Sequence, residues 1–517
     1  MGNFNASPSS NSSGHGGHGG QLSGGLKPRH VTMLSIAGVI GAGIFVGSGT
    51  AISQAGPAVL LSFLAAGTLV VLVMRMLGEM ASANPDSGSF SVYASRAIGR
   101  WAGFSIGWLY WWFWVLVIPV EATAAAIILN AWMPGVPLWV FALLVTLALT
   151  ITNLFSVKNY GEFEFWFALL KVVAIIAFIG VGVLAFVGFF GPAHAGAGNL
   201  VNHGGFMPNG GGSVIAAILT TMFMFMGTEI VTIAAAESAH PAEQIRKATK
   251  SVIWRISIFY VGSIFFVVCL VPWTSPALVK DGSFLAALNV LGIPGAQLLV
   301  SIVVLVSVSS CLNSALYTAS RMAFSLSVRG DGPKLLAKVA RTGTPIPAVL
   351  APTIVGFLAV IANYVMPEKA FSMLLATSGA VALLVYFVIA VSQLMTRRQI
   401  NASGVKPPVL MWGYPYLTWA VIIFIPVVLL YMGFFSTLKV ELAATAVLAV
   451  CVVAAGVYIQ RRFGQHAEDS GGVGTPAHHP GHAEVDAAAG RRVNAPVGPD
   501  GEYEDMALDD EGFPPSA

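Results

Sequence analysis

The segment AGVIGAGIFVGSG, residues 37–49, carries five glycines in the middle of the apolar stretch 31–52. Glycine weakens a helix by about 1 kcal/mol relative to alanine, and Gly41 and Gly43 leave flanking halves of only about 15 Å each. We therefore predict a helix that is interrupted near its centre. The alternative interpretation is a continuous helix whose glycines pack closely against a neighbouring helix.

The composition indicates that this segment belongs to a membrane protein. Of the 517 residues, 56% are hydrophobic and 9% are charged, against roughly 25% charged residues in soluble domains. The three cysteines lie in apolar stretches, so neither a disulfide framework nor a cysteine metal site is predicted. Residues 1–30 contain no apolar stretch typical of a cleavable signal peptide.

Apolar stretches of about 20 residues, the length that crosses a bilayer, recur along the chain. Lipid cannot satisfy exposed backbone amides, so each crossing is expected to be helical. The predicted fold class is an all-α polytopic membrane protein with twelve transmembrane helices. The twelve segments are 31–52, 57–77, 105–130, 137–155, 163–189, 213–236, 251–272, 294–320, 347–363, 371–394, 415–435 and 440–459.

Lysine and arginine are divided unevenly between two alternating sets of loops. One set holds 20 of them, whereas the opposite set holds only Lys280, Lys369 and Lys439. Because positively charged short loops stay on the cytoplasmic side, both termini are predicted to be cytoplasmic and the location to be the cell membrane. The Gly/Ser/His-rich tail 1–28 and the tail 463–517, with 11 acidic residues, are too poor in apolar groups to fold and are predicted to be disordered.

A second interruption is predicted in the sixth segment, which contains MFMFMGTEIVTIAAAE, residues 222–237. Gly227, Thr228 and Glu229 lie there near mid-membrane depth, and an ionised carboxylate at that depth must face a polar cavity or a partner. The first and sixth segments open two successive groups of five. Interrupted helices at matching positions of two halves indicate a transporter with its binding site between the repeats.

The predicted transporter domain, 29–462, therefore consists of an inverted five-plus-five repeat and two additional helices. Repeat one spans 31–189, repeat two spans 213–394 and the additional helices lie in 415–459. Each repeat contains an odd number of crossings, which is why the repeats are inverted. Unwound backbone between them exposes amides and carbonyls that suit a carboxylate and an ammonium group.

Few ionisable or polar side chains lie inside the predicted helices. Glu121 and Glu229 are interpreted as substrate or proton groups, with buried structural pairing as the alternative. Lys171 is interpreted as a proton-coupling amine, although its stem is long enough to reach the cytoplasmic surface. Ser310, Asn313 and Ser314, in the eighth segment, either line a pathway or form hydrogen bonds between helices.

Several function classes lack their sequence motifs. The chain has no GxxxxGK[ST] phosphate loop, no aspartyl-phosphate signature and no TVGYG filter. We therefore expect no enzyme activity, no cofactor, no metal and no ATP or nucleic-acid partner. Transport across the lipid bilayer driven by an ion gradient remains.

The chain from about 26 to 462 resembles the amino acid, polyamine and organocation (APC) transporter superfamily, in its bacterial amino acid permease branch and especially the γ-aminobutyrate permeases. The motifs that carry this resemblance are RHVTMLSIAGVIGAGIFVGSG (29–49), IGRWAGFSIGWLYWWFWVLVIPVEA (98–122), VKNYGEFEFWFALLKV (157–172), GTEIVTIAAAES (227–238), SVIWRISIFY (251–260) and SSCLNSALYTASRM (309–322). The two tails match nothing in this pattern.

The resemblance implies a LeuT-like fold, proton-coupled uptake and alternating access. It places substrate-binding positions on two unwound segments and on the third helix, and the proton-coupling amine on the fifth. At position 42 many relatives carry a hydroxyl residue and this chain carries Ala, so contact there is expected through backbone amides. The implied residues are Gly41, Ala42, Gly43, Phe225, Gly227, Thr228 and Glu229 for substrate, Glu121 for substrate and proton, and Lys171 for the proton.

The function expected from these features together with the resemblance is proton-coupled import of a small zwitterionic amino acid, with γ-aminobutyrate as the expected substrate. The same mechanism with another neutral amino acid (β-alanine, glycine, alanine, serine or an aromatic residue) is the alternative. A sensor built on the transporter fold, which binds an amino acid without moving it, is the alternative from a different class.

Overall fold

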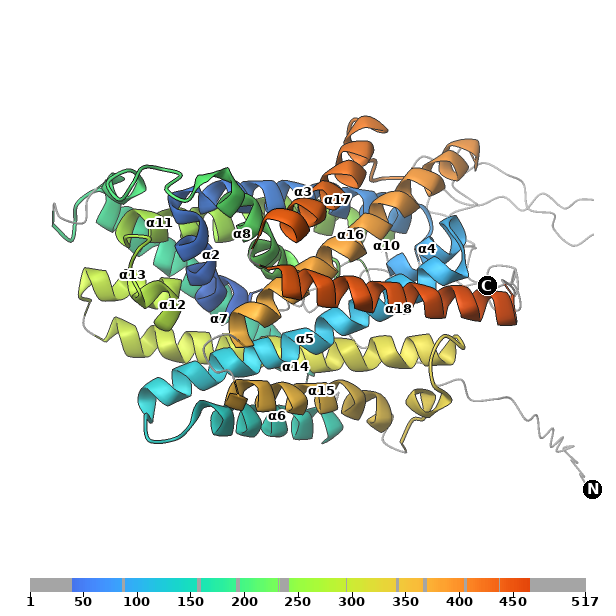
Figure 1. Cartoon of the computed structure of the whole chain (residues 1–517), viewed down its shortest axis with the longest axis horizontal. Helices are drawn as coiled ribbons and strands as arrows, with labels where there is room; N and C mark the ends of the chain where they lie inside the picture. The colour runs from blue at the N-terminus through green and yellow to red at the C-terminus, as the bar shows by residue number, and fades with distance from the viewer. Residues whose placement is uncertain are drawn as a thin grey trace, which may run out of the picture. The chain divides into compact units, whose positions relative to one another are not determined.

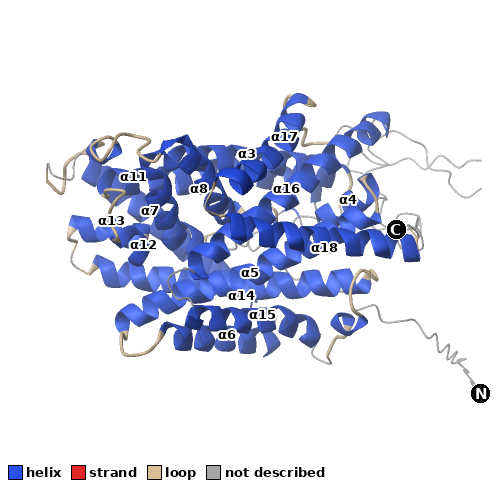
Figure 2. Ribbon diagram, viewed as in Figure 1, coloured by secondary structure: helices blue, strands red, loops and turns tan. Residues whose placement is uncertain are grey.

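The computed structural model describes residues 40–464 except 86–88, 156–159, 192–195, 231, 233–240, 294, 341–343, 366–369, 404–406 and 437. Within that part of the chain, every regular element is a helix (Figure 2). The predicted tails 1–28 and 463–517 lie outside the described residues, apart from Phe463 and Gly464, so their disorder stays a prediction.

The long helices overlap the predicted apolar segments, whereas short helices at Ser89–Ala97, Ala277–Lys280 and Ser283–Leu291 lie between those segments. Among the described residues, eight helical stretches are long and apolar enough to cross a membrane, and three shorter apolar helices accompany them. The predicted all-α membrane fold is confirmed. The main helices are α2 (Ser48–Ala55), α3 (Val59–Ala83), α4 (Ser89–Ala97), α5 (Arg100–Trp132), α6 (Leu138–Phe155), α7 (Tyr160–Phe186), α8 (Gly210–Phe225), α10 (Pro241–Arg255), α11 (Ser263–Leu270), α12 (Ala277–Lys280), α13 (Ser283–Leu291), α14 (Ala296–Val328), α15 (Ile346–Val365), α16 (Ala370–Ser403), α17 (Tyr416–Phe435) and α18 (Lys439–Phe463).

Two long helices, α5 and α14, pack along each other and are covered on one side by α6 and α15 (Figure 1). A helix that is apolar on all faces is stable only when lipid or protein surrounds it, and most of α5 is buried in protein. A second group consists of α2, α3, α8 and α10, and α16 contacts members of both groups.

Both predicted interruptions lie where these two groups of helices meet. The helix α8 ends at Phe225, Met226 is extended with ψ 144°, and Gly227 has a φ of 103°. Only glycine adopts that backbone conformation without strain. In the first segment, Ile40 and Gly41 form a bend, and the helical part that follows is a π-helical turn, η1 (Gly43–Gly47), continued by α2. Residues 31–39 of that segment lie outside the described part.

Candidate functional site

At the first interruption, a carboxylate from another helix occupies the exposed backbone amide. The Ala42 N–H donates to both carboxylate oxygens of Glu121 on α5, at N···O distances of 3.1 and 2.9 Å. Both residues are buried, with Glu121 only 1% exposed. An amide at the start of a helix is a favourable partner for an anion because the helix dipole and the unpaired N–H act together.

Gly41 allows Glu121 to come this close. A Cβ atom at Gly41 would overlap Glu121 Oε1 and would lie 2.8 Å from Cys311 Sγ. Gly41, Glu121 and Cys311 therefore meet at one point between the start of η1, α5 and α14.

We expect Gly41→Ala to destabilise the protein by about 1–3 kcal/mol, as overpacking of a filled core does. The matched control is Gly433→Ala in α17, where an added Cβ meets nothing within 4 Å. Thermal unfolding in detergent should show a lower midpoint for Gly41→Ala than for Gly433→Ala. Equal midpoints would contradict the close approach at Gly41.

The second interruption repeats the arrangement of the first. The Gly227 N–H donates to both carboxylate oxygens of Glu229, at 2.9 and 3.0 Å, and Glu229 is fully buried. The Tyr386 hydroxyl on α16 lies 3.4 Å from Glu229 Oε2. Each break therefore holds a buried protein carboxylate on one backbone amide.

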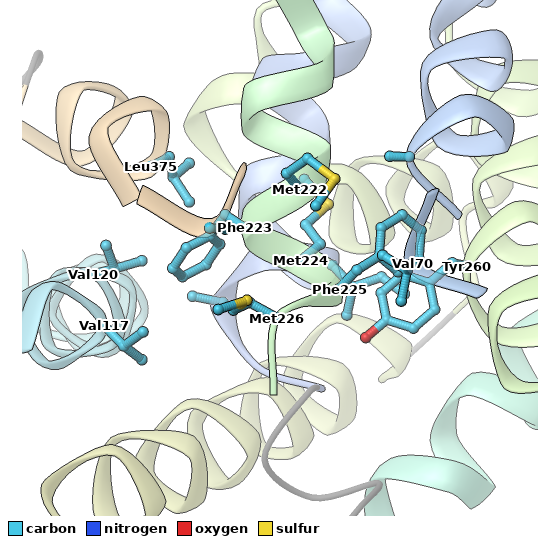
Figure 3. Packing of buried hydrophobic residues seen from close by; sticks show 14 of the residues in the cluster. Val70, Val117, Val120, Met222, Phe223, Met224, Phe225, Met226, Tyr260 and Leu375 are labelled. Atoms are coloured by element: carbon cyan, nitrogen blue, oxygen red, sulfur yellow. The ribbon is translucent and has the colours of Figure 1, made fainter. Parts of the chain in front are cut away.

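A small cavity lies between the two breaks. Its volume of about 10 Å³ gives room for roughly one water molecule. In Figure 3 the Phe223 side chain points from the end of α8 toward Val117 and Val120 of α5, and Met226 lies beside them. The lining residues are Gly43, Phe113, Trp114, Val117, Glu121, Phe223, Met224, Met226 and Cys311.

The carboxyl-terminal end of α8 supplies the opposite polarity. The last four carbonyls of a helix have no partner within that helix, and together they carry a partial negative charge. The Thr228 hydroxyl donates to one of them, the Phe225 carbonyl, at 3.1 Å. The site thus combines the Ala42 amide, at the start of η1, with helix-end carbonyls on α8.

Phe225 does not extend its side chain into this cavity. Its ring packs against Phe63 and Tyr260, at centroid distances of 6.0 and 4.7 Å, on the opposite side of α8 from Phe223 (Figure 3). Any contact of Phe225 with a ligand is therefore through its backbone. The cavity side chains Phe223, Met224 and Met226 were not singled out by the sequence analysis.

Lys171 lies in a second polar cluster, between α7 and α14. Its side chain is fully buried, and Nζ donates to Ser310 Oγ at 3.0 Å. The Ser310 hydroxyl in turn donates to Glu164 Oε1 at 2.6 Å, and Ser314 donates to the same oxygen at 3.1 Å. The amine therefore faces α14 rather than reaching along its helix toward the surface.

Glu164 was missed by the sequence analysis, although one signal for it exists. It precedes Lys171 by seven residues, two helical turns, so both side chains lie on one face of α7. Asn313 does not join the cluster, because its Oδ1 accepts from Asn153 Nδ2 of α6 at 2.6 Å. Ser310 and Ser314 thus lie with Lys171, whereas Asn313 connects two helices.

Comparison with known proteins identifies the family. The family model described as amino acid permease matches residues 30–467. The chain belongs to the amino acid permease family. This permease is 62% identical over 453 residues to a protein of Pseudomonas aeruginosa named probable GABA permease, covering 87% of this chain and 95% of the relative. It is 60% identical over 434 residues to the gamma-aminobutyric acid permease of Escherichia coli, covering 84% and 93%.

A solved structure supports the same fold. A mutant of the manganese transporter of Eremococcus coleocola matches the permease with a TM-score of 0.54 at 15% identity, covering 84% of this chain and 94% of that chain. At this identity the likeness concerns the fold alone. Together with the bend at Ile40 and Gly41 and the end of α8 at Phe225, it confirms the predicted transporter fold.

Proposed function

We propose that this protein imports γ-aminobutyrate, driven by protons and by alternating access. The observation that carries the proposal is the Glu121 carboxylate on the Ala42 amide, a position suited to the carboxylate of a substrate. The 62% and 60% identity to proteins named as GABA permeases supports this choice of substrate.

Binding of the substrate requires Glu121 to give up the Ala42 amide. Two carboxylates about 4 Å apart repel each other by about 4 kcal/mol at an effective dielectric constant of 20. Protonation of Glu121 removes this repulsion and weakens its bond to the amide, because hydrogen bonds to charged groups are about twice as strong as neutral ones. Uptake of a proton by Glu121 is therefore coupled to entry of the substrate carboxylate.

The substrate ammonium is placed at the carbonyl end of α8, across the cavity from Ala42. Helix-end carbonyls and the nearby Glu229 supply negative charge there. The cavity wall between these two ends includes Val117, Phe223 and Met226, apolar side chains that suit a chain of methylene groups. An ω-amino acid places its two charges further apart than an α-amino acid, in keeping with a carboxylate site and an ammonium site on different helices.

Alternating access is part of the proposal because the cavity must widen to admit any amino acid. Its volume of about 10 Å³ is that of roughly one water molecule. The described conformation therefore corresponds to a closed state in which Glu121 occupies the place of the substrate carboxylate. Movement of η1 and α8 relative to α5 and α14 would open the cavity.

Uptake by proteoliposomes tests the proposed substrate. We expect labelled γ-aminobutyrate to accumulate under an inward proton gradient and to leave when an uncoupler is added. Unlabelled γ-aminobutyrate should compete best, β-alanine less well, and glycine and phenylalanine least. If an α-amino acid inhibits uptake more strongly than unlabelled γ-aminobutyrate, the substrate belongs to the alternative class. Saturable binding without any uptake would indicate a sensor.

A further inference from the structure

We infer that Glu164 is the proton acceptor for Lys171 and that the Ser310 hydroxyl carries the proton between them. This inference rests on the proposed proton-coupled transport. It adds Glu164 to the proton pathway and gives the direction of proton transfer. Glu164 and Lys171 are 1% and 0% exposed, and ionisable groups buried at membrane depth are costly unless they serve a function or are paired.

The direction of proton transfer follows from the donors and acceptors. An ammonium group only donates hydrogen bonds, so Ser310 Oγ accepts from Lys171 Nζ and has its single proton left for Glu164 Oε1. The O···O distance of 2.6 Å lies in the range of a hydroxyl that donates to a carboxylate. The three groups therefore form one oriented chain from the amine to the carboxylate.

Transfer along this chain balances in protons and charge. The Nζ–H proton passes to Ser310 Oγ while the original hydroxyl proton passes to Glu164. The ammonium becomes an amine, the carboxylate becomes a carboxylic acid, and Ser310 keeps one proton throughout. Rotation of the hydroxyl then resets Ser310, and the starting charges return once Glu164 releases its proton and Lys171 takes up another.

The neighbouring groups connect this chain to the substrate site. Lys171 lies on the same helix as Glu164, and Ser310 and Ser314 donate hydrogen bonds to Glu164 from α14. Cys311, next to Ser310 in the sequence, has its Sγ beside Gly41, where Glu121 Oε1 also lies.

Glu164 lies seven residues closer than Lys171 to the start of α7, about 10 Å along the helix axis. The distribution of lysine and arginine predicts that this end of α7 faces the cytoplasm. The relay therefore leads from the middle of the protein toward the side on which an imported proton must be released.

Glu164→Gln and Ser310→Ala test the relay in proteoliposomes. We expect each variant to slow γ-aminobutyrate accumulation under a proton gradient by about 10²-fold, the usual contribution of a positioned proton-transfer group. Exchange of labelled for unlabelled γ-aminobutyrate without a gradient should persist, since it needs no net proton transfer. Ser310→Thr keeps a hydroxyl and should restore accumulation, and Ser314→Ala should slow it less than Ser310→Ala.

The matched control is Ser307→Ala, a fully buried serine of α14 whose Oγ has no hydrogen-bond partner among the described residues. Accumulation by wild type and by Glu164→Gln at the same rate would overturn the relay while leaving the proposed function intact. Loss of exchange together with accumulation in a folded Glu164→Gln protein would also overturn it and assign a structural role. Absence of accumulation by the wild type would instead refute the proposed function.

Discussion

Replacing Glu121 with Gln is expected to abolish proton-driven accumulation of γ-aminobutyrate and to leave its binding intact or stronger. The carboxamide still accepts from the Ala42 N–H, but the bond is neutral and therefore weaker. It carries no charge to repel the substrate carboxylate and no proton to exchange. We expect accumulation to fall by about 10²-fold.

Equilibrium binding measured across a range of pH separates this role from others. Wild-type affinity for γ-aminobutyrate should change with pH, and the affinity of Glu121→Gln should not. Glu441→Gln, at a carboxylate of α18 that is 9% exposed, is the control and should behave as wild type. Loss of binding in Glu121→Gln would instead indicate that Glu121 holds the substrate ammonium.

Lys171→Ala and Lys171→Arg are expected to have the second large effect. Alanine removes the amine and leaves Glu164 with an uncompensated buried charge, which costs about 3–5 kcal/mol. Arginine keeps the charge but does not release a proton. Both variants should therefore lose accumulation, and only the alanine variant should also lose stability.

Thermal unfolding and uptake together check this prediction. The arginine variant should unfold at nearly the wild-type temperature while accumulating about 10²-fold more slowly. Proton-driven accumulation by Lys171→Arg at the wild-type rate would remove Lys171 from proton transfer.

The parts of the site that are local in sequence could be predicted. Glycines such as Gly41 and Gly43 weaken a helix wherever they occur. Gly227 close to Glu229 indicates a break that faces protein or a polar cavity, because lipid offers no partner to the carboxylate. These features depend on backbone propensity and membrane depth alone. Their positions in the first and sixth segments also indicated the fold.

The partners of these breaks could not be predicted, because they come from distant segments. Glu121 lies 79 residues from Ala42, and Glu164 lies 146 residues from Ser310. Which partner each carboxylate meets depends on how α5, α7 and α14 pack. In sequence, Glu164 resembled an ordinary charged residue near the end of a membrane segment.

The direction of the side chains at the end of α8 also could not be predicted from the sequence. Phe223 and Phe225 lie two residues apart in a run of alternating Met and Phe, so about 200° separates them around a helix. One must point into the cavity if the other points away. The rotation of α8 against Tyr260 and Val117 decides which does.

A structure of the protein with bound γ-aminobutyrate would show whether the substrate replaces Glu121 at the first interruption. We expect the substrate carboxylate within hydrogen-bond distance of the Ala42 N–H, with Glu121 displaced from it and the ammonium at the carboxyl-terminal end of α8. A complex in which Glu121 still occupies the Ala42 amide while γ-aminobutyrate binds elsewhere would contradict it.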